Sequence, residues 1–275
     1  MGRLLAICPD AGLVAALTPA LREHALVVCG GSVEALKRVR DVPVDVVITD
    51  ARTSVAEDLA VAAELRSIRP GVRLIVMAPA ATHEDVVAAL RAQVFACFAP
   101  PFDYAEVAEM AVSALWAIDW KSGIDVVSGL PYWMTLRVSC HLLNADRLVR
   151  FMTERENSLP AEDRDLLMTA FREMLINAME HGAGFDPDKV IEVTAARTER
   201  AIVYHFRDPG NGFDREDLTL AAQSRVPEDI LDVTIQRERA GRRPGGFGML
   251  LVKQIADELV YNERGNEVLL IKHLK

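Results

Sequence analysis

The chain has 275 residues, about the length of two ordinary domains, and its 51% hydrophobic and 26% charged residues are typical of a folded globular protein. Its net charge of -9 argues against general binding of nucleic acid or of an anionic membrane, because both depend on clustered Lys and Arg. The four cysteines form no C-x-x-C pair or metal-binding spacing, and no apolar run is long enough to span a bilayer, so we expect a cytoplasmic protein with reduced thiols.

The first half alternates short apolar runs with amphipathic stretches. Apolar runs typical of buried parallel strands occupy residues 3–8, 25–29, 44–49, 72–78 and 94–99. The intervening segments, 11–23, 31–40, 55–67, 83–92 and 103–118, place apolar residues at helical spacing. This pattern predicts an α/β fold, with a five-stranded doubly wound parallel sheet over residues 1–119.

Asp50 ends the run VDVVITD, at the sheet edge where doubly wound folds place their ligands. A carboxylate in this position is a phosphoacceptor, a metal ligand or a helix cap. Residues 3–118 resemble the receiver domain of bacterial response regulators, in which VDVVITD matches the strand before the phosphorylated Asp and FAPPFDYAEV matches the segment after the last strand. The resemblance makes Asp50 the possible phosphoacceptor.

The sequence departs from a working receiver at positions that serve phosphoryl transfer. Of the acidic pair that holds Mg²⁺ only Asp10 is present, Ala78 replaces a hydroxyl residue, and Pro100 replaces a Lys. The lost groups stabilise charge on the transferred phosphoryl group. We therefore favour a pseudo-receiver kept for docking or dimerisation, with Asp50 as a solvated carboxylate at the end of its strand.

Residues 120–133 break the alternation with two Gly, a Pro and two Trp, which indicates a linker. No helix pair with a phosphorylatable His, as a histidine kinase requires, fits between the halves.

Residues 134–275 predict a second domain of mixed helices and alternating strands. A strand is expected at 134–140, helices at 144–156 and 159–182, two strands within 189–208, a helix at 248–259 and a final strand pair. Helices beside such a sheet predict an α+β sandwich.

Three segments of this domain suggest a ligand site. Glu173, Asn177 and His181 are spaced four apart on one side of the long helix, although a solvated helix face is the alternative interpretation. DPGNGFD (208–214) follows a strand and alone indicates only a turn. RRPGGFGM (242–249) leads glycines into a helix N-terminus, where backbone amides are able to bind phosphate.

In this order the segments resemble the N, G1 and G2 boxes of the ATPase fold shared by histidine kinases, gyrase and Hsp90, and the compact form looks most like the anti-sigma-factor serine kinases. The resemblance implies ATP and Mg²⁺ as cofactors, Glu173 as general base and Asn177 as metal ligand. It also implies that Asp208 binds the adenine amino group. The other residues implied to bind the nucleotide are His181, Gly210, Gly212, Arg243, Gly245, Gly246, Gly248 and Met249.

Residues 213–244 would form an ATP lid, and Arg237, Arg239, Arg242 and Arg243 are its candidate γ-phosphate ligands. We expect an ATP-dependent serine/threonine protein kinase whose partners are an anti-sigma-factor antagonist and a sigma factor. The family resemblance also implies a homodimer. The alternatives are an ATP-binding regulatory module without significant turnover, and a histidine-kinase-like catalytic domain that acts in trans.

Overall fold

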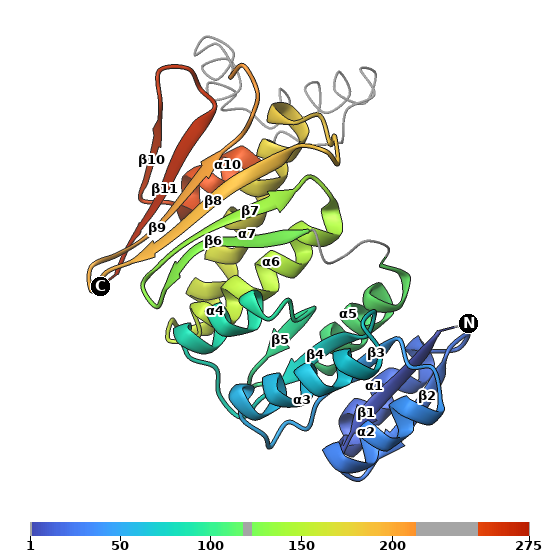
Figure 1. Ribbon diagram of the computed structural model, residues 1–275. Helices are drawn as coiled ribbons and strands as arrows, with labels where there is room; N and C mark the ends of the chain where they lie inside the picture. Colours follow the sequence, from blue (N-terminus) through green and yellow to red (C-terminus); the bar gives the residue numbers. More distant parts are fainter. Residues whose placement is uncertain (1, 118–122, 213–246, 275) are drawn as a thin grey trace. The chain divides into compact units, whose positions relative to one another are not determined.

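The computed structural model describes residues 2–117, 123–212 and 247–274. By their contacts the residues form two compact units, Met1–Ile124 with Arg150–Asn157, and Asp125–Val149 with Ser158–Lys275. Each unit is described by itself, with the labels of Figure 1.

The first unit contains five strands in one parallel sheet. The strands are β1 (Arg3–Ile7), β2 (Ala25–Cys29), β3 (Val46–Ile48), β4 (Arg73–Met77) and β5 (Ala96–Phe98), in the order β2-β1-β3-β4-β5. The helices between and after them are α1 (Ala11–Ala20), α2 (Ser32–Asp41), α3 (Val55–Ile68), α4 (His83–Arg91) and α5 (Tyr104–Trp116). This strand order is that of flavodoxin-like doubly wound folds, and it confirms the fold predicted for the first half.

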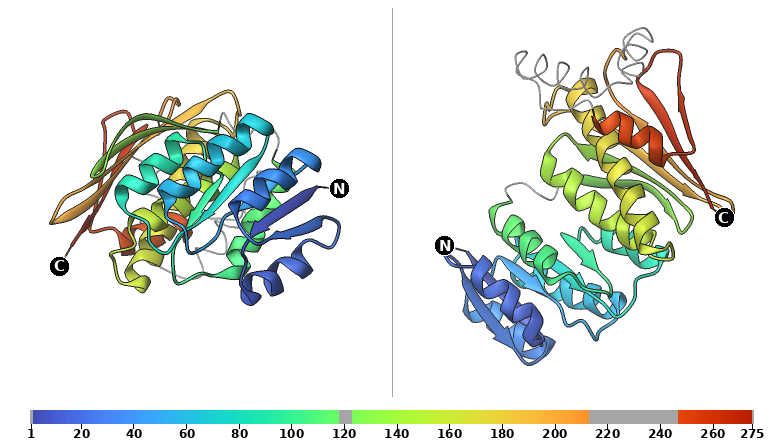
Figure 2. Two further views of the ribbon diagram at one scale, coloured as in Figure 1. Left: turned by 60° about the horizontal axis from the view of Figure 1, so that its bottom comes forward. Right: turned by 180° about the vertical axis from the view of Figure 1, so that it is seen from behind.

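Helices cover both faces of this sheet. α1 and α5 pack together, while α3 packs against both α2 and α4 (Figures 1 and 2). The strands are short and apolar because both of their faces are covered, and every residue of β3 and β5 is buried. Capping boxes of Ser54 with Glu57 and of Thr82 with Asp85 fix the starts of α3 and α4.

The second unit contains a six-stranded sheet. Its strands are β6 (Ile124–Leu130), β7 (Trp133–Ser139), β8 (Val190–Arg197), β9 (Ala201–Arg207), β10 (Glu258–Tyr261) and β11 (Glu267–His273), in the order β10-β11-β9-β8-β7-β6. The helices are α6 (Leu142–Arg155), α7 (Ala161–Asn177), a π-helical turn η2 (Ala178–Gly182) and α10 (Phe247–Ile255). The antiparallel sheet with helices confirms the predicted α+β sandwich.

One face of this sheet forms the core with the helices. Alternate residues of β7, β8 and β9 point into that core, and those on β9 are Ile202, Tyr204 and Phe206, all at most 1% exposed. α7 packs against α10 and against β9 (Figure 1). The other face of the sheet therefore presents the intervening residues, which include Val203 and His205.

The last turns of α6 belong to the first unit. Arg150 Nη1 donates to Glu106 Oε2 at 2.8 Å, and its guanidinium lies 4.8 Å from the centroid of the Phe98 ring. Asn157 Nδ2 donates to the carbonyl of Ala81 at 2.6 Å. The contacts of residues 150–157 thus differ from the sequence expectation, which placed the whole helix in the second domain.

The range 120–133, expected to be a linker, contains β6. This strand includes a Gly and a Ser, residues that punctuate chains, but it continues the six-stranded sheet beyond β7. Edge strands need only one paired neighbour, which is why a sequence of weak strand character still forms one here. None of the helices in the described part of the chain is long and apolar enough to cross a membrane.

Candidate functional site

Glu173 and Asn177 lie one turn apart on α7, and both are half-buried. On the opposite side of the same helix, Phe171 packs edge-on against Tyr204 and at a tilt against Phe206, with ring centroids 4.8 and 5.2 Å apart. These aromatic contacts fix the rotation of α7 on the sheet. As a result the carboxylate and the amide share the side that faces away from the core.

The helix changes its geometry directly after Asn177. η2 closes with a bond from the Ala183 N–H to the carbonyl of Ala178, which is five residues back, at 3.1 Å. A π-helical turn contains more residues than an α-helical turn, and His181 lies within this turn instead of in α7. His181 is exposed, and its charge acts on the neighbouring Asp208.

Gly182 brings the end of η2 against the loop after β9. A Cβ atom at Gly182 would overlap the carboxyl group of Asp208, and one at Gly210 would lie 2.8 Å from the carbonyl oxygen of Gly182. The backbone therefore approaches Asp208 so closely that only glycine fits at both positions.

The Asp208 carboxylate is held in a defined position. Its Oδ1 accepts the Gly210 N–H at 2.8 Å. Burial raises the pKa of this carboxyl above its ordinary value, although the Gly210 amide, Arg264 and His181 act in the opposite direction. A half-buried carboxylate with one oxygen bonded to the backbone keeps its other oxygen as an acceptor for a ligand N–H.

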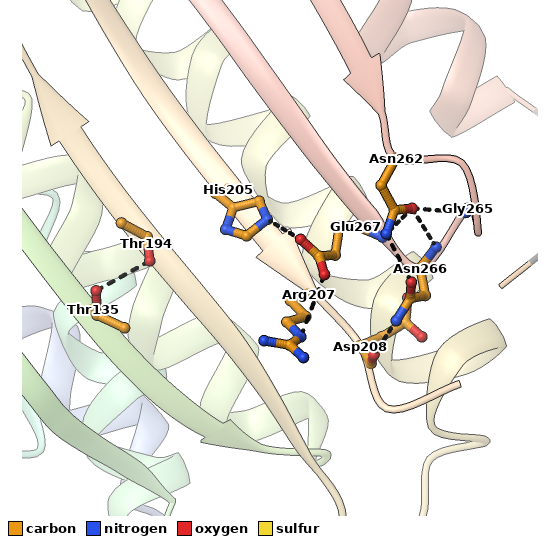
Figure 3. A network of polar contacts seen from close by, with 9 residues as sticks. All are labelled: Thr135, Thr194, His205, Arg207, Asp208, Asn262, Gly265, Asn266 and Glu267. Atoms are coloured by element: carbon orange, nitrogen blue, oxygen red, sulfur yellow. Dashed lines mark hydrogen bonds and ion pairs between the residues drawn. The ribbon is translucent and has the colours of Figure 1, made fainter. Parts of the chain in front are cut away.

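Two asparagines of the β10–β11 connection support this loop (Figure 3). Asn262 Oδ1 accepts the N–H groups of Gly265, Asn266 and Glu267 at 2.7, 3.1 and 3.2 Å. The Asn266 side chain accepts from Asn262 Nδ2 at 3.0 Å and donates to the carbonyl of Asp208 at 3.2 Å, while the Asp208 N–H donates to the carbonyl of Asn266 at 3.1 Å. Sequence reasoning missed both asparagines, since the segment NERGN reads only as a turn.

Gly212 makes a second contact with the same connection. Its φ is +81°, and a Cβ atom there would overlap the carbonyl of Arg264. Arg264 also donates to the side chain and the carbonyl of Asn211, at 3.3 and 3.4 Å. Only glycine combines this conformation with so close an approach.

α10 places Gly248 beside Glu173. A Cβ atom at Gly248 would overlap Glu173 Oε2, so the start of this helix lies directly against the carboxylate. Met249 is half-buried, and its Sδ lies 3.6 Å from the hydroxyl of Tyr261. A helix N-terminus presents free backbone amides, and here they adjoin the acidic side chain of α7.

These features fit a nucleotide with a divalent cation. Gly248, in the first turn of α10, places no side chain beside the backbone amides that a phosphate would bind, and Asn177 offers an oxygen ligand of the kind that Mg²⁺ prefers. Among the residues that the structure describes, no group of three or more His, Cys, Asp or Glu forms a metal cluster, so the phosphates would have to supply further ligands. The predicted lid and its arginines, with Arg243, Gly245 and Gly246, lie outside the described residues.

In the first unit, Asp50 is paired with Arg52 of its own loop. Arg52 Nε donates to Oδ1 at 2.9 Å and Nη2 donates to Oδ2 at 2.7 Å, while the Arg52 backbone N–H bonds Oδ1 at 3.0 Å. These bonds lower the pKa of the Asp50 carboxyl, and the side chain is only 13% exposed. Asp50 is thus not the simply solvated carboxylate that we expected, because it forms a forked ion pair with Arg52.

Asp10, the remaining acidic residue after β1, serves as a helix cap. Its Oδ1 accepts the N–H of Leu13 at 2.8 Å, and its Oδ2 accepts the hydroxyl of Tyr104. Both carboxylate oxygens are therefore engaged within the protein.

Behind Asp50 lies a buried carboxyl group, Asp58, which is 2% exposed. The hydroxyls of Thr49 and Thr53 donate to its two oxygens at 2.6 and 2.7 Å. Burial nevertheless raises the pKa of Asp58 to about 6.

Comparison with known proteins gives a family match for one part of the chain. Residues 140–272 match the model of the histidine kinase-like ATPase domain. A comparison with curated proteins finds no match.

Among solved structures, a response regulator from Thermotoga maritima is 15% identical, with a TM-score of 0.37, over 42% of this chain and 99% of that one. The HemR receiver domain from Leptospira biflexa is 16% identical, with a TM-score of 0.38, over 43% of this chain and 97% of that one.

The five-stranded doubly wound sheet of the first unit has the strand order expected of a receiver, and the family match covers the residues that converge around Glu173 and Asp208. The chain thus contains a doubly wound unit with the strand order of a receiver, and a segment, residues 140–272, that is similar to the histidine kinase-like ATPase domain.

Proposed function

We propose that this protein is an ATP-dependent serine/threonine protein kinase of the anti-sigma-factor type, which acts in a partner-switching pathway under the influence of its receiver-like domain. Its proposed protein partners are an anti-sigma-factor antagonist, as the phosphorylated substrate, and a sigma factor. The observation that carries the proposal is the contact of Glu173 with the start of α10 at Gly248.

This contact supports phosphoryl transfer rather than nucleotide binding alone. The backbone amides at the start of α10 would hold the phosphates, and a carboxylate beside them is in the right place to accept a proton from an attacking hydroxyl. Asn177, one turn further along α7, would place Mg²⁺ between the nucleotide phosphates and the protein. The ion would neutralise charge on the transferred group.

Adenine recognition would fall to Asp208. Its carboxylate would accept the exocyclic amino group, as the resemblance implies, and the Asn262–Asn266 bonds would keep its backbone in place. Gly210 and Gly212 would let the base approach the loop.

The decisive experiment mixes the protein with Mg-ATP and candidate anti-sigma-factor antagonist proteins, and analyses the products by mass spectrometry. We expect phosphoserine or phosphothreonine on the antagonist. Glu173→Gln should retain nucleotide binding, measured by calorimetry, and should lose transfer by roughly 100-fold or more, as expected when a general base is removed.

Other results would identify the alternatives. Nucleotide binding with no transfer to any candidate would make the protein an ATP-binding regulatory module. Acid-labile phosphate on a partner would reveal a histidine-kinase-like activity in trans. Equal transfer by the wild type and Glu173→Gln would refute the role given to Glu173.

A further inference from the structure

The face of the C-terminal sheet opposite the helices has a groove with mainly apolar walls. Its volume is about 380 Å³, which is within the range of small-molecule sites. The groove extends from Trp133 on β7 to Val260 on β10, and these side chains are 52% and 47% exposed, which is high for large apolar groups. Val203 and Leu269 line the groove between them. An exposed apolar hollow of this kind indicates a binding site.

The polar side chains in the walls are bonded within the protein. The hydroxyl of Thr194 lies 3.1 Å from that of Thr135. His205 Nε2 lies 3.2 Å from Glu267 Oε2, and Arg207 Nε lies 3.5 Å from Glu267 Oε1 (Figure 3). Each oxygen of the Glu267 carboxylate therefore has a partner within the same sheet.

This pairing determines which ligand the groove would accept. A charged group would lose its water on entering the groove, and among the described wall residues the one carboxylate is already paired. An uncharged aromatic or branched aliphatic molecule instead gains from contact with Trp133, Val203 and Leu269. Charge complementarity thus favours an uncharged, mainly apolar small molecule.

The walls of the groove are also connected with the nucleotide site. Asn262, which lines the groove, donates to the Asn266 side chain at 3.0 Å, and Asn266 Nδ2 donates to the carbonyl of Asp208 at 3.2 Å (Figure 3). Tyr261, another wall residue, places its hydroxyl 3.6 Å from the Sδ of Met249 on α10. A ligand that contacts both β9 and β10 would therefore hold the β10–β11 connection against the Asp208 loop.

We infer that this groove binds an uncharged, mainly apolar small molecule, and that this ligand tightens nucleotide binding at Asp208. A ligand that stabilises the arrangement in which Asp208 is held favours the conformation that binds the nucleotide. By linkage, the nucleotide tightens binding of the ligand by the same factor. The coupling rests on the nucleotide site of the proposed function, whereas the ligand site itself does not.

Fluorescence titration with N-phenylnaphthylamine, an uncharged probe that brightens in apolar sites, tests the ligand site. Anilinonaphthalene sulfonate is the matched charged probe, because it has the same rings and an added sulfonate. We expect saturable binding of the uncharged probe, and binding roughly tenfold weaker or more for the sulfonate.

Variants of the walls show where the probe binds. Val203→Asp should weaken binding of the uncharged probe roughly tenfold or more, because it places a charge in the groove. Trp133→Ala, at a largely exposed position, should also weaken it, and this variant serves if melting temperatures show that Val203→Asp has lost its fold. Leu166→Asp is the matched control, since Leu166 is an apolar residue of α7 that is 44% exposed outside the groove, and it should not change probe binding.

Calorimetry with ADP tests the coupling. We expect the affinity for ADP to rise about fivefold or more when the uncharged probe saturates the groove, and to rise less in Trp133→Ala at the same probe concentration. In Asn266→Ala, the affinity for the probe should no longer respond to saturating ADP, because the bond to the Asp208 carbonyl is lost. A general stabilisation of the fold by the probe would not depend on this bond.

The outcomes separate the two parts of the inference from the proposed kinase activity. Equal binding of the two probes, no binding of the uncharged probe, or unchanged binding in folded groove variants would overturn the ligand site. Probe binding that leaves the affinity for ADP unchanged would overturn the coupling, and a protein that binds no ADP would contradict the coupling and the nucleotide site together. Tight ADP binding without phosphoryl transfer would contradict the kinase proposal alone.

Discussion

Replacing Gly182 by Ala tests whether the Asp208 carboxylate, which lies against Gly182, binds the nucleotide. The added Cβ atom would overlap the Asp208 side chain from its Cβ atom to its carboxyl group, at 2.2 to 2.3 Å, so the whole side chain has to move. An adenine amino group would then lose its charged acceptor. A hydrogen bond to a charged group contributes about 1.5–3 kcal/mol, which corresponds to a loss of nucleotide affinity of roughly 10- to 100-fold.

Isothermal titration calorimetry with ADP gives the dissociation constant directly. Gly71→Ala is the control, because a Cβ atom at Gly71 in the first unit meets no atom within 4 Å. Circular dichroism and thermal melting show whether Gly182→Ala keeps its fold. A correctly folded Gly182→Ala protein with the affinity of the wild type would refute the assignment of Asp208 to the nucleotide site.

Three further predictions concern carboxyl groups. Burial raises the pKa of Asp208, so nucleotide affinity should be constant at high pH and should fall as the pH drops through this raised value. Calorimetry should show no such fall for Asp208→Asn, and the same pH profile in both proteins would contradict the prediction. Asp58 binds its proton more tightly in the folded state, with a pKa of about 6 against 3.8, so the free energy of unfolding should decrease by about 3 kcal/mol as the pH rises through that window. Urea denaturation of Asp58→Asn should show a correspondingly smaller decrease, and an equal decrease in both proteins would contradict the assignment. Arg52→Ala should raise the pKa of Asp50 towards its ordinary value, as followed by carboxyl NMR shifts, and an unchanged titration would show that the forked ion pair does not form.

The fold of the first unit was predictable because its strands are buried on both faces. The run 72–78 is then apolar except for Arg73, and β4 occupies Arg73–Met77 within that range. The strand β6 was missed since it lies at the edge of its sheet, where burial imposes a weaker pattern on the sequence. The two Gly, the Pro and the two Trp of residues 120–133 suggested a linker instead.

The candidate site was predictable where chemistry is local. Glu173 and Asn177 stand out as polar residues beside an apolar helix face, and Asp208 stands at the end of a strand. Asn262 and Asn266 were not predictable, because their bonds depend on how the β10–β11 connection meets the Asp208 loop in three dimensions. The π-helical turn that contains His181 was not predictable either, because it leaves no periodic signal in one sequence.

The ion pair of Asp50 and Arg52 bears on how the receiver-like domain responds to its surroundings. A receiver that holds Mg²⁺ takes its positive charge from solution, so its electrostatic state varies with the concentration of the ion. Here the positive charge belongs to Arg52, two residues after Asp50 in the same chain, and it is present at every magnesium concentration. The charge of the surface near this loop therefore does not depend on the magnesium concentration. A partner that binds there would meet the same charges whether or not the ion is present.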